Sequence, residues 1–235
     1  MPPAAHPTPL NVRAILFPFL LLLFASSAIA VETPRVWNVT DAATLAAAVN
    51  GSAAGDEIIL AHNTKPYAGP IVLKASQKLT GAAGDPAPVI SGVDGVAITA
   101  SGGATIRNVA VNGNGKAAGV RVAGGNVTID RCSFRDNASA VDVAAGETAT
   151  VAITITSNRF QHNGAAVTVS ALAKSHVRVT MSKNTIAETA VSAISLFSDG
   201  TADLGATIAQ NEISGAVCGG GSTCSRRSAR VTSRC

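Results

Sequence analysis

Aromatic and charged residues are both scarce in this chain of 235 residues. Only 3% of the residues are Phe, Tyr or Trp and 14% are charged, whereas 47% are hydrophobic. The low charge excludes a disordered polyelectrolyte. The low aromatic content argues against an ordinary mixed core built on large rings. The apolar residues are instead mostly Ala, Val and Ile, beside 22 Gly, and this mixture of small and β-branched residues favours a regular β architecture.

Long apolar stretches are missing after the first thirty residues. Arg13 precedes a short apolar run, 14–25, and Ala28-Ile29-Ala30 has the small-x-small form of a signal-peptidase site. A membrane span needs about 20 apolar residues, and this run is shorter and interrupted by Pro18. We therefore expect residues 1–30 to be a signal peptide. The mature chain is expected to be secreted or periplasmic, with no membrane contact after cleavage.

The formal net charge of +4 misrepresents the body of the chain. Five of the 18 Lys and Arg residues lie before residue 31 or after Gly215, so residues 31–215 carry 13 basic and 14 acidic side chains. The remaining cations are scattered, with no stripe interleaved with aromatics that could follow a phosphate backbone. We therefore expect no nucleic-acid partner.

One apolar spacing recurs five times along the chain. An apolar residue is followed by a small or polar residue three positions on, and by another apolar residue two positions later. The instances are Ile106/Val109/Val111, Ile129/Cys132/Phe134, Ile155/Asn158/Phe160, Met181/Asn184/Ile186 and Ile208/Asn211/Ile213. Four alternating stretches follow these instances, namely 120–122, 141–143, 167–169 and 194–196. Each repeat therefore holds three short strands and shows no helical period.

Three short strands per repeat describe a coil that buries its inward residues only by stacking on its neighbours. Successive coils are expected about 4.8 Å apart. The middle position holds Asn158, Asn184 and Asn211, which suits a ladder of amides at a tight bend. Cys132 takes the same place one coil earlier, where a small side chain fits inside the bend. Solvent-exposed turns are the alternative, and the fixed register with the flanking apolar residues favours the ladder.

The amino-terminal region completes a resemblance to a known family. Residues 36–39 read as a short strand, Thr40 or Asp41 can cap a helix over 42–49, and Gly55-Asp56-Glu57-Ile58-Ile59-Leu60 follows. Together with the repeats, this pattern resembles the right-handed parallel β-helix of the pectin-lyase-like superfamily. The resemblance implies an all-β fold, a right-handed single-stranded parallel β-helix (solenoid) with an N-terminal capping helix. We expect it to span residues 31–215 in five to seven coils.

The repeat pattern stops after Gly215. Residues 216–235 are rich in Cys, Ser and Arg and contain no acidic residue, so we expect a disordered tail. Cys218 and Cys224 could form a disulfide in an exporting compartment, whereas a zinc site is disfavoured because no His lies nearby. The apolar column would then end open or be covered by a partner, and the chain could be a truncated or decayed enzyme.

The resemblance also implies where a ligand binds. Enzymes of the superfamily hold polysaccharide along the outer face of the first strand of each coil and the loop before it. The outward residues of that strand are Arg121, Asp142, Thr168 and Ser195, and the preceding loops supply Lys116, Asp136, Asn137, His162, Asn163 and Glu188. From these we select Lys116, Arg121, Asp142, His162 and Thr168 as candidate substrate-binding residues. Arg121 and Asp142 are also expected to form an ion pair between adjacent coils.

No catalytic residue can be assigned. A polyuronate lyase needs a cation that stabilises the developing enolate and a base that removes the proton alpha to the carboxylate. Calcium prefers several converging oxygens, and Asp136 and Asp142 supply two carboxylates at most. We therefore assign no metal site, and calcium is the only cofactor with any support. The motifs of family polygalacturonases and pectate lyases are absent, and His162 and His176 suit solvated turn residues.

Two functions remain open at this point. The first is an exported protein that binds an acidic, uronate-containing polysaccharide, with cleavage undecided. If the chain is an enzyme, a polysaccharide lyase is the first expectation and a glycoside hydrolase the second. The other function is a non-catalytic, adhesin-like or structural surface solenoid. The family resemblance supports the first function, whereas the missing catalytic motifs and the short chain support the second.

Overall fold

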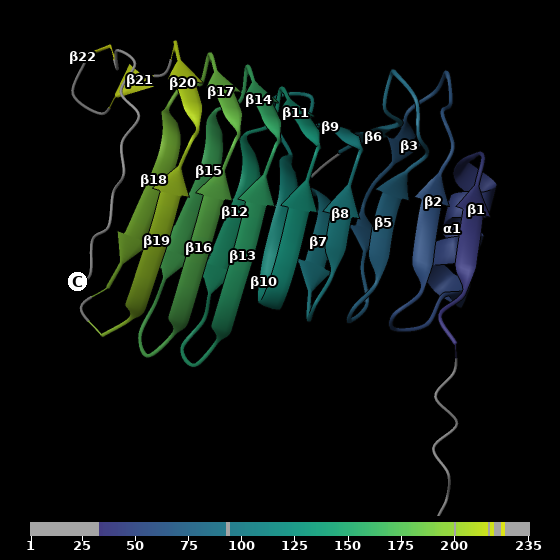
Figure 1. Ribbon diagram of the computed structural model, residues 1–235, viewed down its shortest axis with the longest axis horizontal. Coiled ribbons are helices and arrows are strands. Elements are labelled where there is room, and N and C mark those ends of the chain that lie inside the picture. Colours follow the sequence, from purple (N-terminus) through teal and green to yellow (C-terminus); the bar gives the residue numbers. More distant parts are fainter. Residues whose placement is uncertain (1–32, 93–94, 200, 216, 219–221, 224–235) are drawn as a thin grey trace, which may run out of the picture. The chain divides into compact units, whose positions relative to one another are not determined.

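The computed structural model describes residues 33–92, 95–199, 201–215, 217–218 and 222–223, and it is a parallel β-solenoid (Figure 1). The expected signal peptide and most of the expected tail lie outside the described residues. Within the described part of the chain, no helix is long and apolar enough to cross a membrane.

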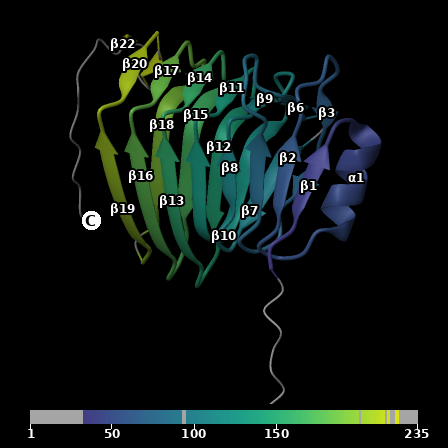
Figure 2. The ribbon, with the colours of Figure 1, turned by 45° about the vertical axis from the view of Figure 1, so that its right-hand side comes forward.

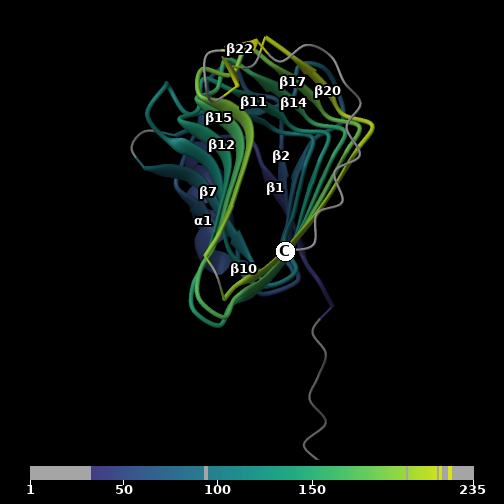
Figure 3. The same cartoon turned by 90° about the vertical axis from the view of Figure 1, so that its left-hand side faces the viewer.

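Three parallel faces build the solenoid, and they surround one interior when viewed along the stacking direction (Figure 3). Figure 2 shows the stacked coils obliquely. Face A contains β1 (Val36–Val39), β2 (Glu57–Leu60), β5 (Lys78–Gly81), β8 (Thr105–Arg107), the second half of β10 (Ala118–Asp130), β13 (Thr150–Thr156), β16 (His176–Ser182) and β19 (Asp203–Ala209). Face B contains β3 (Tyr67–Ala68), β6 (Val89–Ser91), β9 (Ala110–Asn112), β11 (Ser133–Arg135), β14 (Arg159–Gln161), β17 (Thr185–Ala187) and β20 (Glu212–Ser214). Face C contains β4 (Ile71–Val72), β7 (Val96–Ser101), the first half of β10, β12 (Ser139–Ala145), β15 (Ala165–Ala171) and β18 (Ser192–Ser198).

The period-2 alternation of the sequence decides which side chains enter the interior. In β16, Val177, Val179 and Met181 point inward and are at most 2% exposed, while the residues between them face solvent. Like residues stack on like across coils, as expected. The rings of Phe134 and Phe160 are stacked with centroids 5.1 Å apart and an interplanar angle of 8°. Each coil thus buries its apolar residues against the next coil rather than within itself.

The corner between faces A and B contains the expected asparagine ladder. The Oδ1 atom of Asn184 accepts hydrogen bonds from the backbone N–H of Asn158 at 2.9 Å and from its Nδ2 at 3.0 Å. Asn211 accepts the same pair of bonds from Asn184. Cys132 occupies the equivalent place, 2% exposed, and its N–H donates to Oδ1 of Asn158 at 2.8 Å. The ladder therefore satisfies backbone groups of adjacent coils that would otherwise be buried without partners.

A second ladder at the corner between faces B and C corrects the sequence analysis. Asn137 and Asn163 were expected in ligand-binding loops, but they are 1% and 0% exposed. Oδ1 of Asn163 accepts from the N–H and the Nδ2 of Asn137, at 3.0 and 2.9 Å. The residues before them, Asp136 and His162, have left-handed backbone angles with φ of 52° and 54°. The chain therefore turns at these residues and directs each following asparagine into the corner.

The helix α1 (Ala42–Gly51) caps the first coil and extends two residues beyond the expected range. Asp41 is its N-cap, because its carboxylate accepts from the N–H of Thr44, whose hydroxyl accepts from the N–H of Asp41. Leu45 and Ala48 face the core and are 5% and 1% exposed. This helix covers the amino-terminal end of the apolar column, as the resemblance implied.

The carboxyl-terminal end of the described solenoid is less covered. Residues on β18, β19 and β20 such as Ile194 and Ile208 are only partly buried, while Val167 and Met181 one coil earlier are fully buried. Beyond this coil, the structure describes β21 (Val217–Cys218) and β22 (Ser222–Thr223), which pair antiparallel.

Candidate functional site

The outer surface of face C carries a polar row that crosses successive coils. Arg121 pairs in register with Asp142, Asp142 with Thr168, and Thr168 with Ser195. Each of these residues follows an inward Val or Ile, so the alternation places all four outside. The expected alignment of Arg121, Asp142 and Thr168 on the outer side of one face is therefore confirmed.

Arg121 and Asp142 form the expected ion pair between adjacent coils. The Nε atom of Arg121 lies 3.3 Å from Oδ2 of Asp142, and the two side chains are 49% and 24% exposed. A pair this open to solvent contributes little to stability, typically about 0–1 kcal/mol. The guanidinium of Arg121 retains donors for another partner, because Arg has five N–H groups in a planar fork.

Lys116 and His162 lie on the turns that precede face C. The exposed Lys116 precedes β10, and no carboxylate of the described residues lies within 4.0 Å of its ammonium. His162 precedes β15, two coils away, which corresponds to about 10 Å. The Nε2 atom of His162 lies 2.6 Å from Oε2 of Glu188. The structure thus places the two residues on the same edge of face C without bringing them into contact.

Phe197 is a candidate ligand-binding residue that the sequence analysis missed. It lies on β18 in register with Ser170, and its side chain points outward from face C. It is 55% exposed, and it is the one aromatic residue among the exposed large hydrophobic side chains of the described residues. The alternation that continues from Ile194 through Phe197 was the signal that could have found it.

The polar groups of this surface suit binding better than bond cleavage. Asp142 is engaged by Arg121, and Asp136 lies 3.3 Å from Nε of Arg135. Over the described ranges, no group of three or more His, Cys, Asp or Glu side chains could hold a metal ion. The surface therefore offers cations, hydroxyls and one aromatic ring to a ligand.

A cluster on face A holds a further group of charges. Arg178 makes two hydrogen bonds to the carboxylate of Asp203, at 2.9 and 2.5 Å, and His176 lies 3.4 Å from the same carboxylate. Arg178 does not need a further anionic partner, because its guanidinium already binds the carboxylate of Asp203 through two hydrogen bonds. The hydrogen bond from Arg178 also lowers the pKa of Asp203 below its ordinary value. The carboxylate is thus held in its charged form and suits a salt bridge better than a general acid.

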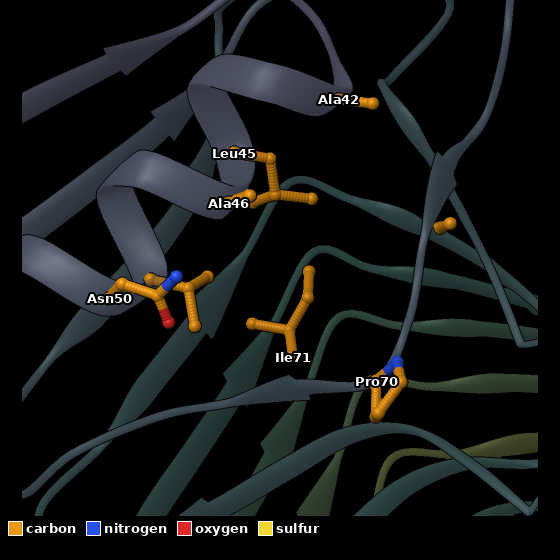
Figure 4. Close-up of a pocket in the computed structure, with 8 residues that line it drawn as sticks. Ala42, Leu45, Ala46, Asn50, Pro70 and Ile71 are labelled. Atoms are coloured by element: carbon orange, nitrogen blue, oxygen red, sulfur yellow. The ribbon is translucent and has the colours of Figure 1, made fainter.

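A pocket of about 260 Å³ lies near the cap, at the opposite end from Phe197 (Figures 1 and 4). It is lined by Ala42, Leu45, Ala46, Val49 and Asn50 of α1 and by Ala68, Pro70 and Ile71 of the adjoining loop and strands. Asn50 supplies the one polar side chain of this lining. Since no lining side chain titrates, the pocket offers no group for acid–base chemistry.

Comparison with known proteins supports the β-helix architecture and assigns no function. A family model described as a right-handed beta helix region matches residues 89–234, which is more than half of the chain. No curated protein and no solved structure matches the chain.

Proposed function

The chain belongs to the family of proteins with a right-handed β-helix region, and on this premise we propose that it binds an acidic polysaccharide along the outer surface of face C. The observation that carries the proposal is the position of Phe197. This exposed ring shares face C with the row formed by Arg121, Asp142, Thr168 and Ser195.

An aromatic ring beside a row of hydroxyls suits a sugar chain. Sugar rings present apolar C–H faces that stack on aromatic side chains, while their hydroxyls need hydrogen-bond partners. Ser195, two positions before Phe197 on β18, and its register partner Thr168 supply hydroxyls on the same side of the sheet as Phe197. From the coil of Arg121 to the coil of Phe197 the distance along the stack is three interstrand spacings, about 14 Å. A ligand that uses both ends of this surface must therefore be an extended polymer or an oligosaccharide.

The two cations near the start of this surface support the acidic character of the ligand. Lys116 and Arg121 belong to the same coil, one on the turn and one on the strand that follows. Arg can bind a carboxylate with two parallel N–H donors, and Lys adds a compact charge. The carboxylates of a polyuronate would compete with Asp142 for Arg121 and would bind Lys116 directly.

The proposal extends to binding and not to cleavage. A glycoside hydrolase needs two carboxyl groups that flank the scissile bond, and the row on face C contributes Asp142 alone. Export of the protein is part of the proposal, and it rests on the sequence of residues 1–30. An adhesin-like or structural solenoid is the competing function.

The test is calorimetric titration of the protein with pectate, alginate and a glycosaminoglycan. We expect one polymer to bind. Phe197→Ala should weaken binding about threefold to tenfold, since an aromatic contact is worth roughly 0.5–1.5 kcal/mol beyond its area. Lys116→Ala should weaken binding and reduce its dependence on salt.

Val36→Ala is the matched control, because Val36 is 56% exposed but lies on β1 of face A. An equal loss in this variant would reject face C as the binding surface. If the unaltered protein binds none of the polymers, the structural solenoid is favoured. Release of products that absorb ultraviolet light would show that the protein is a lyase.

A further inference from the structure

The last described coil of the solenoid leaves three strand edges open. Among the described strands, β19 pairs only with β16, β18 only with β15 and β20 only with β17. The N–H of Asp203 donates back to Ser175. Because successive N–H groups of a strand point to opposite sides, those of Leu204, Ala206 and Ile208 point toward the open end. Such an edge is a template for pairing with another segment.

Apolar side chains are also accessible at this end. Leu196 is 37% exposed, whereas Val169, its register partner one coil earlier, is 0% exposed. Val191, on the turn before β18, is 67% exposed. An apolar column that ends in water costs free energy, which is why terminal coils of solenoids are normally capped. The open end is therefore a surface on which burial of another segment is favourable.

This terminal coil is acidic. Residues 188–215 contain four carboxylates, Glu188, Asp199, Asp203 and Glu212, and no Lys or Arg. Arg178 and His162 of the preceding coil engage Asp203 and Glu188. Asp199 and Glu212 have no cation within 4.0 Å among the residues that the structure describes. A segment that covers this end is therefore favoured if it is basic.

We propose that residues 216–235 of the same chain cover the carboxyl-terminal end of the solenoid. These 20 residues contain four Arg and no acidic side chain, so their charge complements that of the terminal coil. They begin two residues after the end of β20, and the 12 residues that follow the β21–β22 pair, 224–235, reach up to about 40 Å when extended. Both features allow the segment to return across the three open edges.

Two further observations support this proposal. β21, which lies within it, contacts β18, the terminal strand of face C (Figure 1). The family match also continues to residue 234, past the last described coil. The proposal departs from the disordered tail that the composition of residues 216–235 had suggested.

A second copy of the chain is a poorer occupant. Two carboxyl-terminal ends brought together would face acidic coil with acidic coil, and like charges at short range repel. A head-to-tail arrangement would require the amino-terminal end of another copy, which α1 already covers. The segment of the same chain meets neither obstacle.

Residue-resolved amide hydrogen exchange on the full chain tests the proposal. In the unaltered protein we expect the amides of Leu204, Ala206 and Ile208 to be protected at every protein concentration. A variant with Arg226→Ser, Arg227→Ser, Arg230→Ser and Arg234→Ser should exchange them at least about tenfold faster. Raising the salt concentration from 0.05 M to 1 M should accelerate the same amides in the unaltered protein.

The control variant removes four cations that lie at least two coils from the terminal coil, through Lys65→Ser, Lys78→Ser, Arg131→Ser and Arg159→Ser. It should leave the three amides protected, and amides of β13 and β16 should be unchanged in every sample. Open-side amides that exchange freely in the unaltered protein would overturn the proposal. Equal acceleration in the control variant would also overturn it. Protection that grows with concentration, together with a doubled mass, would assign the surface to a second copy instead.

Discussion

Asn184 accepts two hydrogen bonds from Asn158, one from its backbone N–H and one from its side-chain amide. In the other direction, Nδ2 of Asn158 donates to the carbonyl of Ile129, one coil further back. One side chain thus connects three successive coils at a corner from which water is excluded. Because each asparagine repeats this pattern, the register of a coil is set by the coil beside it.

Removal of one rung of this ladder should destabilise the protein strongly. Asn184→Ala leaves the buried N–H and side-chain amide of Asn158 without their shared acceptor, and it removes one of the donors to the carbonyl of Ile155. We expect a loss of about 2–4 kcal/mol in the free energy of unfolding, since each unsatisfied buried group costs roughly 1–3 kcal/mol. Urea denaturation followed by circular dichroism measures this loss.

Asn126→Ala is the corresponding control, because Asn126 is exposed on β10. Its effect should stay within about 0.5 kcal/mol. Similar losses for the two variants would show that the ladder contributes nothing beyond ordinary packing.

Asp142→Asn should strengthen the binding of an acidic polysaccharide. The substitution removes the carboxylate that lies 3.3 Å from Nε of Arg121, so the guanidinium no longer has to exchange one anion for another. The gain should be about threefold at low salt and should shrink as salt is added. Titration calorimetry at two salt concentrations measures it. A loss of affinity would mean that Asp142 itself contacts the ligand.

The protein should lose stability in acid through Asp56. The backbone N–H of Arg35 is the foremost of three donors that hold the pKa of Asp56 below its ordinary value; the others are the N–H of Ala53 and the indole of Trp37. A carboxyl whose pKa is lower in the folded state stabilises the protein above its unfolded-state pKa. That contribution disappears as the pH falls through the folded-state pKa.

Asp56→Asn isolates this contribution. Thermal unfolding of both proteins between pH 7 and pH 2 should show a shallower decline for the variant below about pH 4. Asp41, Asp199 and Asp203 also have lowered pKa values, so the variant retains part of the decline. Parallel curves would contradict a role for Asp56.

Cys132 should be inert in the folded protein. Burial is the main cause that raises the pKa of its thiol to about 12. At pH 8 the reactive thiolate is therefore scarcer than in an exposed cysteine by a factor of roughly a thousand. Alkylation with iodoacetamide, read by peptide mass spectrometry, should modify Cys132 only after denaturant is added. Rapid modification of the native protein would show that the corner opens.

The regular parts of the fold were predictable from the sequence. Alternation within strands separates inward from outward positions, so the alignment of Arg121, Asp142 and Thr168 followed from the repeats. Asn158 and Asn184 were recognisable as a ladder because apolar residues flank them at fixed distances. The cap helix followed from the resemblance and from an N-cap residue, Asp41, at its start.

The second corner was harder to predict. Asn137 and Asn163 follow the charged or polar residues Asp136 and His162, so their surroundings in sequence look like an exposed turn. Polar side chains occur both inside and outside such corners, and composition does not distinguish the two. The 26-residue separation of Asn137 and Asn163, equal to that of Asn158 and Asn184, was the available signal.

Both corner ladders repeat at 26 residues over the central coils, and this has a genetic consequence. An in-frame duplication of 26 codons, such as those for residues 138–163, would insert a coil that carries its own two corner asparagines, Asn158 and Asn163, and its own inward residues. The new coil would lengthen each face by about 4.8 Å without requiring any other position to change. Unequal recombination can thus change the length of the three faces, and with it the length of the proposed binding surface, in single steps of one coil.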